Sequence, residues 1–187
     1  ICNFPALASA ATPRTKAVIP VHIYGHPADM PAIMEVARAQ DILVIEDCAE
    51  SHGATCRGRM TGSFGDMACF SFYANKIITT GEGGMVVTSD SGLADKLRLL
   101  RNLGFTQPRF RHEVAGFNFR MTGYQAAMGL VQCRRIEAIV EAKRRVAATY
   151  DRLLTGLPNL QLPRQAPWAR NVYWMYAVVV DRAAGVR

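Results

Sequence analysis

The sequence has no apolar run that is both long enough and sufficiently free of charge to cross a bilayer. Its opening, Ile1 to Pro5, lacks the basic and apolar regions of a signal peptide. The five cysteines are scattered without a C-x-x-C pair, which argues against a disulfide framework and a zinc site. G-x-S-x-G, G-x-G-x-x-G and P-loop motifs are absent, and the histidines lack metal-ligand spacing. We therefore expect a cytoplasmic protein with free thiols, no bound metal and no membrane partner.

The composition is that of a globular chain, with 187 residues of which 50% are hydrophobic and 20% charged. A net charge of +7 raises the possibility of a nucleic-acid partner. However, Arg134-Arg135 and Lys143-Arg144-Arg145 have the spacing of a solvated helix face, and no nucleic-acid-reading motif accompanies them. We expect no nucleic-acid partner and favour a small anionic ligand. Because the chain opens on Ile1 and stops shortly after a strand-like run, we expect a fragment.

The N-terminal part predicts a βαβ unit. Residues 17–23 are typical of a strand, and a helix is expected after Asp29, with Pro31 in its first turn. The uninterrupted apolar run 42–45 is typical of a parallel strand that is buried on both faces. A strand, a helix and such a run together indicate a right-handed crossover in a mainly parallel sheet.

Further elements follow in the same α/β pattern. Two short strands flank a polar, glycine-rich loop, and the segment from Gly104 to Arg120 is irregular and rich in aromatic and arginine residues. The predicted elements are strands over 67–72 and 85–88, a helix from Ser91, helices within 123–156, a linker over 160–168 and a strand over 172–181. We place a large domain over residues 1–158 and the start of a smaller, truncated domain over residues 159–187.

Three polar residues fall where ligands bind in such folds, at the carboxyl ends of the predicted strands. Asp47 follows one strand, Ser71 lies near the end of another, and Lys76 lies in the loop 73–84. A lysine near a carboxylate at this edge suits pyridoxal phosphate (PLP), which needs a Schiff-base amine and a carboxylate on its ring nitrogen. From the residues alone, a solvated loop lysine and a helix-capping aspartate remain the alternatives.

Several motifs in family order resemble the DegT/DnrJ/StrS family of PLP-dependent aminotransferases, which act on nucleotide-linked keto sugars. The resemblance covers nearly everything from residue 12 to about residue 135. The motifs are Thr12-Pro13-Arg14-Thr15-Lys16-Ala17, Val21-His22-Ile23-Tyr24-Gly25, Ile45-Glu46-Asp47-Cys48-Ala49-Glu50-Ser51-His52-Gly53-Ala54, Phe70-Ser71-Phe72-Tyr73-Ala74-Asn75-Lys76, Thr80-Gly81-Glu82-Gly83-Gly84-Met85, and Gly116-Phe117-Asn118-Phe119-Arg120-Met121 with Gln125-Ala126-Ala127. It implies fold type I: a three-layer α/β/α large domain with a mainly parallel sheet, followed by a smaller C-terminal domain.

The resemblance also implies a role for each matching residue. Lys76 corresponds to the lysine that holds the cofactor and moves the proton, and Asp47 to the partner of the pyridinium nitrogen. Ser71 corresponds to the hydroxyl that binds the cofactor phosphate. Asn118 corresponds to the residue that reaches this phosphate from the neighbouring subunit, which implies a homodimer with shared sites. Glu50 stands near the phenolic oxygen, where many relatives have glutamine or histidine.

Within the family, the lysine loop 73–84 is most similar to that of GDP-perosamine synthases, enzymes that move an amino group from L-glutamate to a nucleotide-linked 4-keto-6-deoxy sugar. This implies a role in polysaccharide, including O-antigen, biosynthesis. The basic segment 101–120 would then meet the sugar-nucleotide diphosphate, a hypothesis that Arg109 and Arg111 would test. The alternatives are another keto sugar or keto-cyclitol, and a non-catalytic relative that binds PLP or a sugar nucleotide. Relatives are longer at both ends, so we expect further cofactor contacts outside these residues.

Overall fold

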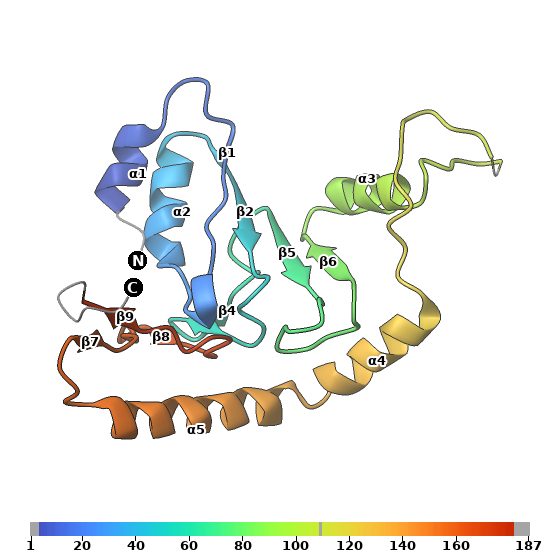
Figure 1. The fold of residues 1–187 in the computed structure, drawn as a ribbon. Coiled ribbons are helices and arrows are strands. Elements are labelled where there is room, and N and C mark those ends of the chain that lie inside the picture. The colour runs from blue at the N-terminus through green and yellow to red at the C-terminus, as the bar shows by residue number, and fades with distance from the viewer. Residues whose placement is uncertain (1–3, 109, 182–187) are drawn as a thin grey trace.

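The computed structural model describes residues 4–108 and 110–181 as a mixed α/β fold (Figure 1). The helices are α1 (Phe4–Ala10), α2 (Met30–Ala39), α3 (Ser91–Arg101), α4 (Gly123–Cys133) and α5 (Ile136–Leu154), with a 3-10 turn at Ile23–Gly25. The strands are β1 (Ala17–Val18), β2 (Leu43–Asp47), β3 (Thr55–Cys56), β4 (Arg59–Met60), β5 (Met67–Ser71), β6 (Gly84–Val87), β7 (Leu160–Gln161), β8 (Ala169–Arg170) and β9 (Val179–Val180).

The central sheet has the order β1-β2-β5-β6. Strands β1, β2 and β5 run parallel, and β6 returns antiparallel to β5. Helix α2 connects β1 to β2 and packs beside α1 on one side of this sheet (Figure 1). The mainly parallel α/β architecture expected from the sequence is therefore confirmed.

Side-chain alternation gives the sheet two different faces. Val44 and Glu46 on β2 are fully buried on the side of α2, where Met30, Ile33 and Ala37 complete a core cluster. Leu43 and Asp47 point to the opposite side, because successive side chains of a strand alternate. Asp47 pairs with Cys69 in register, so Cys69 and Ser71 share that side. We call the side that carries Leu43, Asp47, Cys69 and Ser71 the open face, because Leu43 and Cys69 on it are exposed.

The first strand is shorter than expected, and α2 begins without a side-chain cap. The strand predicted over 17–23 keeps its ladder only at Ala17–Val18, and a single bridge joins Val21 to Asp47. Pro20 has no N–H to donate to a ladder, and the chain then turns at Ile23–Gly25 with Tyr24 at a φ of 57°. Helix α2 begins where predicted, but the side chain of Asp29 accepts no capping hydrogen bond.

The C-terminal segment packs differently from the strand predicted over 172–181, which is wrong for residues 172–178. Only Val179–Val180 form a strand, paired with β7. Val172 instead is fully buried in a second core cluster with Ala54, Ile77 and Val140 of α5. Its backbone N–H donates to Gly25 O at 3.2 Å. The domain boundary at residue 158 stays a prediction.

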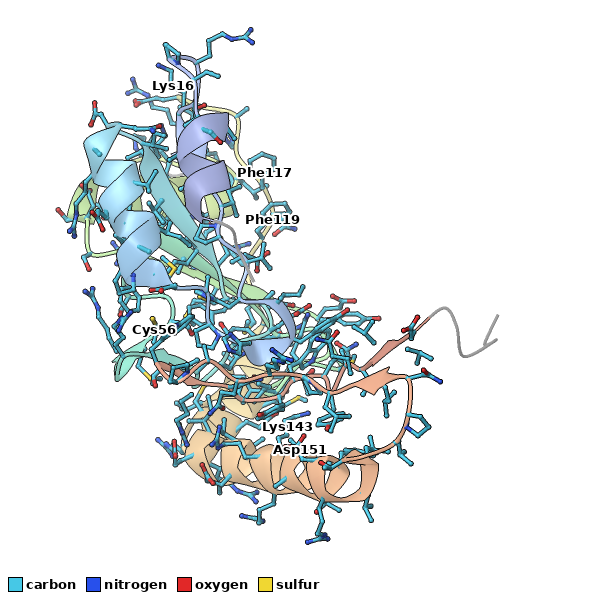
Figure 2. The ribbon with its side chains drawn as sticks, turned by 90° about the vertical axis from the view of Figure 1, so that its left-hand side faces the viewer. Lys16, Cys56, Phe117, Phe119, Lys143 and Asp151 are labelled. Atoms are coloured by element: carbon cyan, nitrogen blue, oxygen red, sulfur yellow. The ribbon has the colours of Figure 1, made fainter. Side chains whose placement is uncertain are left out.

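Helix α5 runs along this segment and is tied to it by polar contacts. Lys143 and Asp151 lie on the side of α5 that faces the segment (Figure 2), and Asp151 accepts a hydrogen bond of 2.6 Å from the Tyr176 hydroxyl. Arg170 of β8 forms ion pairs with Glu137 and Glu141 of the same helix. These contacts hold the stretch 170–176 against the rest of the fold. Among the described helices, none is long and apolar enough to span a bilayer.

Candidate active site

Two of the predicted site residues lie at the carboxyl edge of neighbouring parallel strands. Asp47 ends β2 and Ser71 ends β5, and the register places both on the open face. The Asp47 carboxylate accepts a hydrogen bond from the Ala49 N–H at 3.0 Å, and the Ser71 hydroxyl accepts one from the Tyr73 N–H at 3.3 Å. Both side chains are thus held by the turn that follows their own strand.

Lys76 lies in the loop between β5 and β6, and residues that follow it anchor this loop to the rest of the protein. Ile77 and Ile78 are 5% and 3% exposed, so the two residues after the lysine are anchored in the protein interior. Gln132 of α4 clamps the loop at Thr79, accepting from its N–H at 3.0 Å and donating to its carbonyl at 2.7 Å. The backbone of Lys76 is therefore restrained, even though the loop that carries it consists mostly of polar residues.

The Lys76 amine has a carboxylate and an aromatic ring beside it. Its Nζ lies 4.0 Å from Glu50 Oε1 and 4.1 Å from the centre of the Trp174 ring. Glu50 is itself fixed, because Oε2 accepts a hydrogen bond of 2.6 Å from the Tyr24 N–H. Side-chain exposure is 13% for Lys76 and 17% for Glu50. The structure therefore brings Glu50 to the lysine, as expected for two residues of one site.

Trp174 is a site residue that the sequence did not reveal. It belongs to the segment interpreted as a strand of a second domain, yet its indole N–H donates to Asn75 O at 2.8 Å, next to Lys76. Tyr24 stacks on it at 6.5 Å, and Lys143 Nζ lies 3.5 Å from its carbonyl oxygen. The available signal was the run Tyr173-Trp174-Met175-Tyr176, whose aromatic residues do not alternate with polar ones as in a half-buried strand.

His52 lies behind the lysine in the protein interior. It is 3% exposed and packs between the rings of Phe70 and Phe72 at 5.4 and 5.9 Å. Burial, together with the positive charge of Lys76, lowers the pKa of His52 to about 4. The imidazole is therefore neutral at physiological pH, and Lys76 does not face a second cation there.

Beneath Asp47 lies a buried polar cluster of His22, Glu46 and Cys48, whose ligand atoms lie within 4.8 Å of one another. Glu46 accepts hydrogen bonds from His22 Nε2 at 3.1 Å and from the N–H groups of Gly62, Phe64 and Gly65 at 2.7–2.9 Å. Burial opposes ionisation of Glu46, but these bonds outweigh it and lower its pKa.

The atoms of this cluster already have partners within the protein. His22 Nδ1 accepts from the Ala28 N–H at 3.0 Å, so both of its ring nitrogens are used. Burial raises the pKa of the Cys48 thiol to about 12. Through Glu46, the cluster ties the loop 61–65 to β2.

Asn118, the remaining predicted site residue, lies elsewhere. It is exposed and forms a single bridge with Asn102 at the end of α3. None of the contacts described for residues 4–108 and 110–181 joins it to Asp47, Ser71 or Lys76. Its neighbours Phe117 and Phe119 stack at 5.0 Å and are 53% and 73% exposed (Figure 2). The segment 102–120 extends beyond β6 and α3 (Figure 1).

The same segment carries the basic residues expected to meet a diphosphate. Arg109 lies outside the described residues, and Arg111 pairs with Glu113 at 3.4 Å on the surface. Arg120 lines an open cavity of about 390 Å³, together with Asn102, Phe105, Thr106 and Gln107. This cavity offers one guanidinium and several neutral polar groups to a ligand.

Comparison with known proteins shows the family. The model of the DegT/DnrJ/EryC1/StrS aminotransferase family matches residues 2–187. The chain belongs to this family. It is 51% identical over 174 residues to GDP-perosamine synthase of Caulobacter vibrioides, covering 92% of this chain and 47% of that protein. It is 43% identical over 180 residues to the UDP-N-acetyl-3-dehydro-alpha-D-glucosamine 3-aminotransferase of Acidithiobacillus ferrooxidans, covering 96% of this chain and 48% of that protein.

A crystal structure of Streptomyces venezuelae DesV matches with a TM-score of 0.92 at 39% identity, covering 98% of this chain and 49% of DesV. The chain thus spans about half the length of these relatives. DegT/DnrJ/EryC1/StrS aminotransferases depend on PLP. The residues present fit this cofactor: a carboxylate and a hydroxyl end β2 and β5, and a largely enclosed primary amine lies in the loop that follows β5.

Proposed function

We propose that the protein containing these residues is a PLP-dependent aminotransferase that moves an amino group from L-glutamate to a nucleotide-linked 4-keto-6-deoxy sugar, as GDP-perosamine synthase does. The single observation that carries the proposal is the placement of Lys76, whose amine lies in a largely enclosed position next to the carboxyl edge that carries Asp47 and Ser71. The 51% identity to a GDP-perosamine synthase supports the sugar class.

In this proposal each residue has one task. Lys76 Nζ holds the cofactor covalently and, once released, carries a proton between the amino-acid carbon and the cofactor. PLP supplies an electron sink, and the Asp47 carboxylate keeps its ring nitrogen protonated so that the ring withdraws electrons. The Ser71 hydroxyl binds the phosphate. Glu50 lies beside the amine at 4.0 Å and stabilises its ammonium form.

The test uses the product of the complete reading frame to which these residues belong. Visible absorption is recorded with PLP, before and after adding glutamate, for the natural protein and for Lys76→Ala. We expect a lysine-linked absorption band that glutamate converts to that of the amino form, and no such band in Lys76→Ala. Absence of the band from a folded, cofactor-loaded natural protein would refute the assignment and favour the non-catalytic binding relative.

The sugar is tested after the amino transfer. The glutamate-treated protein is incubated with GDP-, UDP- or dTDP-linked keto sugars, and the products are identified by mass spectrometry. The result distinguishes a GDP-perosamine synthase activity from activity on other keto sugars or keto-cyclitols. A cytoplasmic location and a role in O-antigen biosynthesis stay predictions that such a product would support.

We further propose that the protein is a homodimer in which Asn118 serves the partner's site. Support comes from exposed apolar side chains on two nearby stretches of the chain. Phe117 and Phe119 flank Asn118, and Tyr124 at 88%, Met128 at 52% and Val131 at 56% recur at the spacing of one face of α4. Exposed apolar groups that gather on one face mark interaction surfaces.

Mixing two inactive variants tests this proposal. Lys76→Ala and Asn118→Ala homodimers are each expected to be impaired, whereas their re-paired mixture regains activity. About one quarter of the sites should be intact, because about half of the dimers are mixed and each mixed dimer holds one site with both natural residues. If Asn118 acts within its own subunit, mixing restores nothing.

A further inference from the structure

Trp174 stands out because it contacts the reactive lysine although no motif pointed to it. The indole ring lies 4.1 Å from Lys76 Nζ, within the range of a cation–π interaction. Two contacts hold the ring itself: its N–H donates to Asn75 O at 2.8 Å, and Tyr24 stacks on it. The backbone that carries it is held by Lys143, which donates to its carbonyl, and by the burial of Val172 two residues earlier. A ring held this firmly offers a preformed surface to the ammonium group.

We infer that Trp174, together with Glu50, is the place where the Lys76 ammonium rests whenever the lysine is not joined to the cofactor, and that Trp174 is therefore a positioning residue for proton transfer. The inference rests on the aminotransferase function proposed above. When Lys76 is not joined to the cofactor, its Nζ would take the proton that leaves the amino-acid carbon and become an ammonium. It would then pass this proton on to the cofactor, so the lysine is unchanged overall.

The geometry explains why such a resting place is needed. A free lysine side chain has many rotamers, and holding it near the reacting carbon reduces the entropy that proton transfer would otherwise require. Glu50 neutralises the charge from one side, while the ring face contacts it from another without removing the proton. An aromatic face suits this task because its attraction is weak enough for the amine to leave again.

The experiment compares Trp174→Leu, Trp174→Phe and the matched control Trp168→Phe in the complete protein. Trp168 lies six residues earlier and packs against His26 and the α2 core, away from Lys76. The glutamate half-reaction is followed in single-turnover experiments with ordinary and α-deuterated glutamate. For Trp174→Leu we expect a rate about tenfold lower, a larger isotope effect and unchanged glutamate affinity, with a smaller loss in Trp174→Phe. Trp168→Phe should keep the natural isotope effect.

A second readout needs no activity. In the cofactor-free protein, Lys76→Ala should change the tryptophan emission in a Trp168→Phe background and leave it unchanged in a Trp174→Phe background. The inference is overturned if Trp174→Leu keeps the natural rate and isotope effect, or if Lys76→Ala leaves Trp174 emission unchanged. If instead the natural protein gives no half-reaction while the emission changes as expected, the proposed function fails and the contact stands.

Discussion

Replacing His52 by leucine should make the protein less sensitive to acid. The folded protein holds the pKa of His52 at about 4, against an ordinary value of 6.5, mainly because the ring is buried. Above pH 6.5 both the folded and the unfolded protein carry a neutral His52, so this residue adds no pH dependence. As the pH falls below 6.5, the unfolded chain takes up a proton that the folded protein refuses until about pH 4. Stability is therefore lost across this window.

The size of the loss follows from the two pKa values. A shift of one pKa unit corresponds to about 1.4 kcal/mol, so the full shift is worth about 3 kcal/mol below pH 4, and most of this is lost between pH 7.5 and pH 4.5. Leucine has no titratable group, and its side chain fills a similar volume between Phe70 and Phe72. At pH 7.5 we expect His52→Leu to lie within about 1.5 kcal/mol of the natural protein.

The assay is urea unfolding of both proteins at pH 7.5 and pH 4.5. Other titrating groups are shared, so their contributions cancel when the two free energies of unfolding are subtracted. The stability of His52→Leu relative to the natural protein should rise by about 2–3 kcal/mol at the lower pH. A difference that does not change with pH would refute the reasoning. An NMR titration of the His52 ring that gives an ordinary pKa would refute it independently.

Three further outcomes are expected. Glu46→Gln replaces one carboxylate oxygen, which accepts two hydrogen bonds, by an NH2 donor that faces the same N–H groups, so the free energy of unfolding should fall by about 2–4 kcal/mol, measured by urea unfolding at neutral pH. Gln132→Ala removes both bonds that hold Thr79 and should slow the glutamate half-reaction severalfold while the protein remains folded by circular dichroism. Arg120→Gln should raise the KM for the sugar nucleotide about tenfold and leave the KM for glutamate unchanged. If the variant and the natural protein have the same KM for the sugar nucleotide, Arg120 does not bind the diphosphate.

The sequence predicted most of the parallel core because its signals are local. The apolar spacing of α2 and the uninterrupted run before Asp47 each specify one element, and the crossover rule then orders the strands. The stretch 172–178 was misassigned for the opposite reason. Its position is set by the burial of Val172 against α5 and by the hydrogen bond of Val172 to the turn at Gly25, and these partners lie far away in the chain and leave no periodic pattern.

The residues of the candidate site also fall into those with a local sequence signal and those without one. Asp47 and Ser71 were found because each ends a recognisable strand, and the register then places them on one face. Lys76 was predicted from its place in the loop after the second of these strands, and Glu50 through motif resemblance, and the structure places Lys76 Nζ 4.0 Å from Glu50 Oε1. Trp174 could not be found, because its place at Lys76 depends on how a distant segment folds back. Asn118 is exposed and makes no described contact with the other four residues, so a role in the partner's site stays a prediction.

Glu46 and Asp47 show how one strand links stability to the site. Because consecutive residues of a strand face opposite sides, the anion of Glu46 is directed into the interior and that of Asp47 onto the open face. Glu46 is held by His22 and three backbone N–H groups, so the strand end cannot rotate or slip by one residue without breaking these bonds. A one-residue slip would bury Asp47 and expose Glu46. The buried anchor therefore keeps the Asp47 carboxylate on the face where the ring nitrogen of a cofactor would meet it.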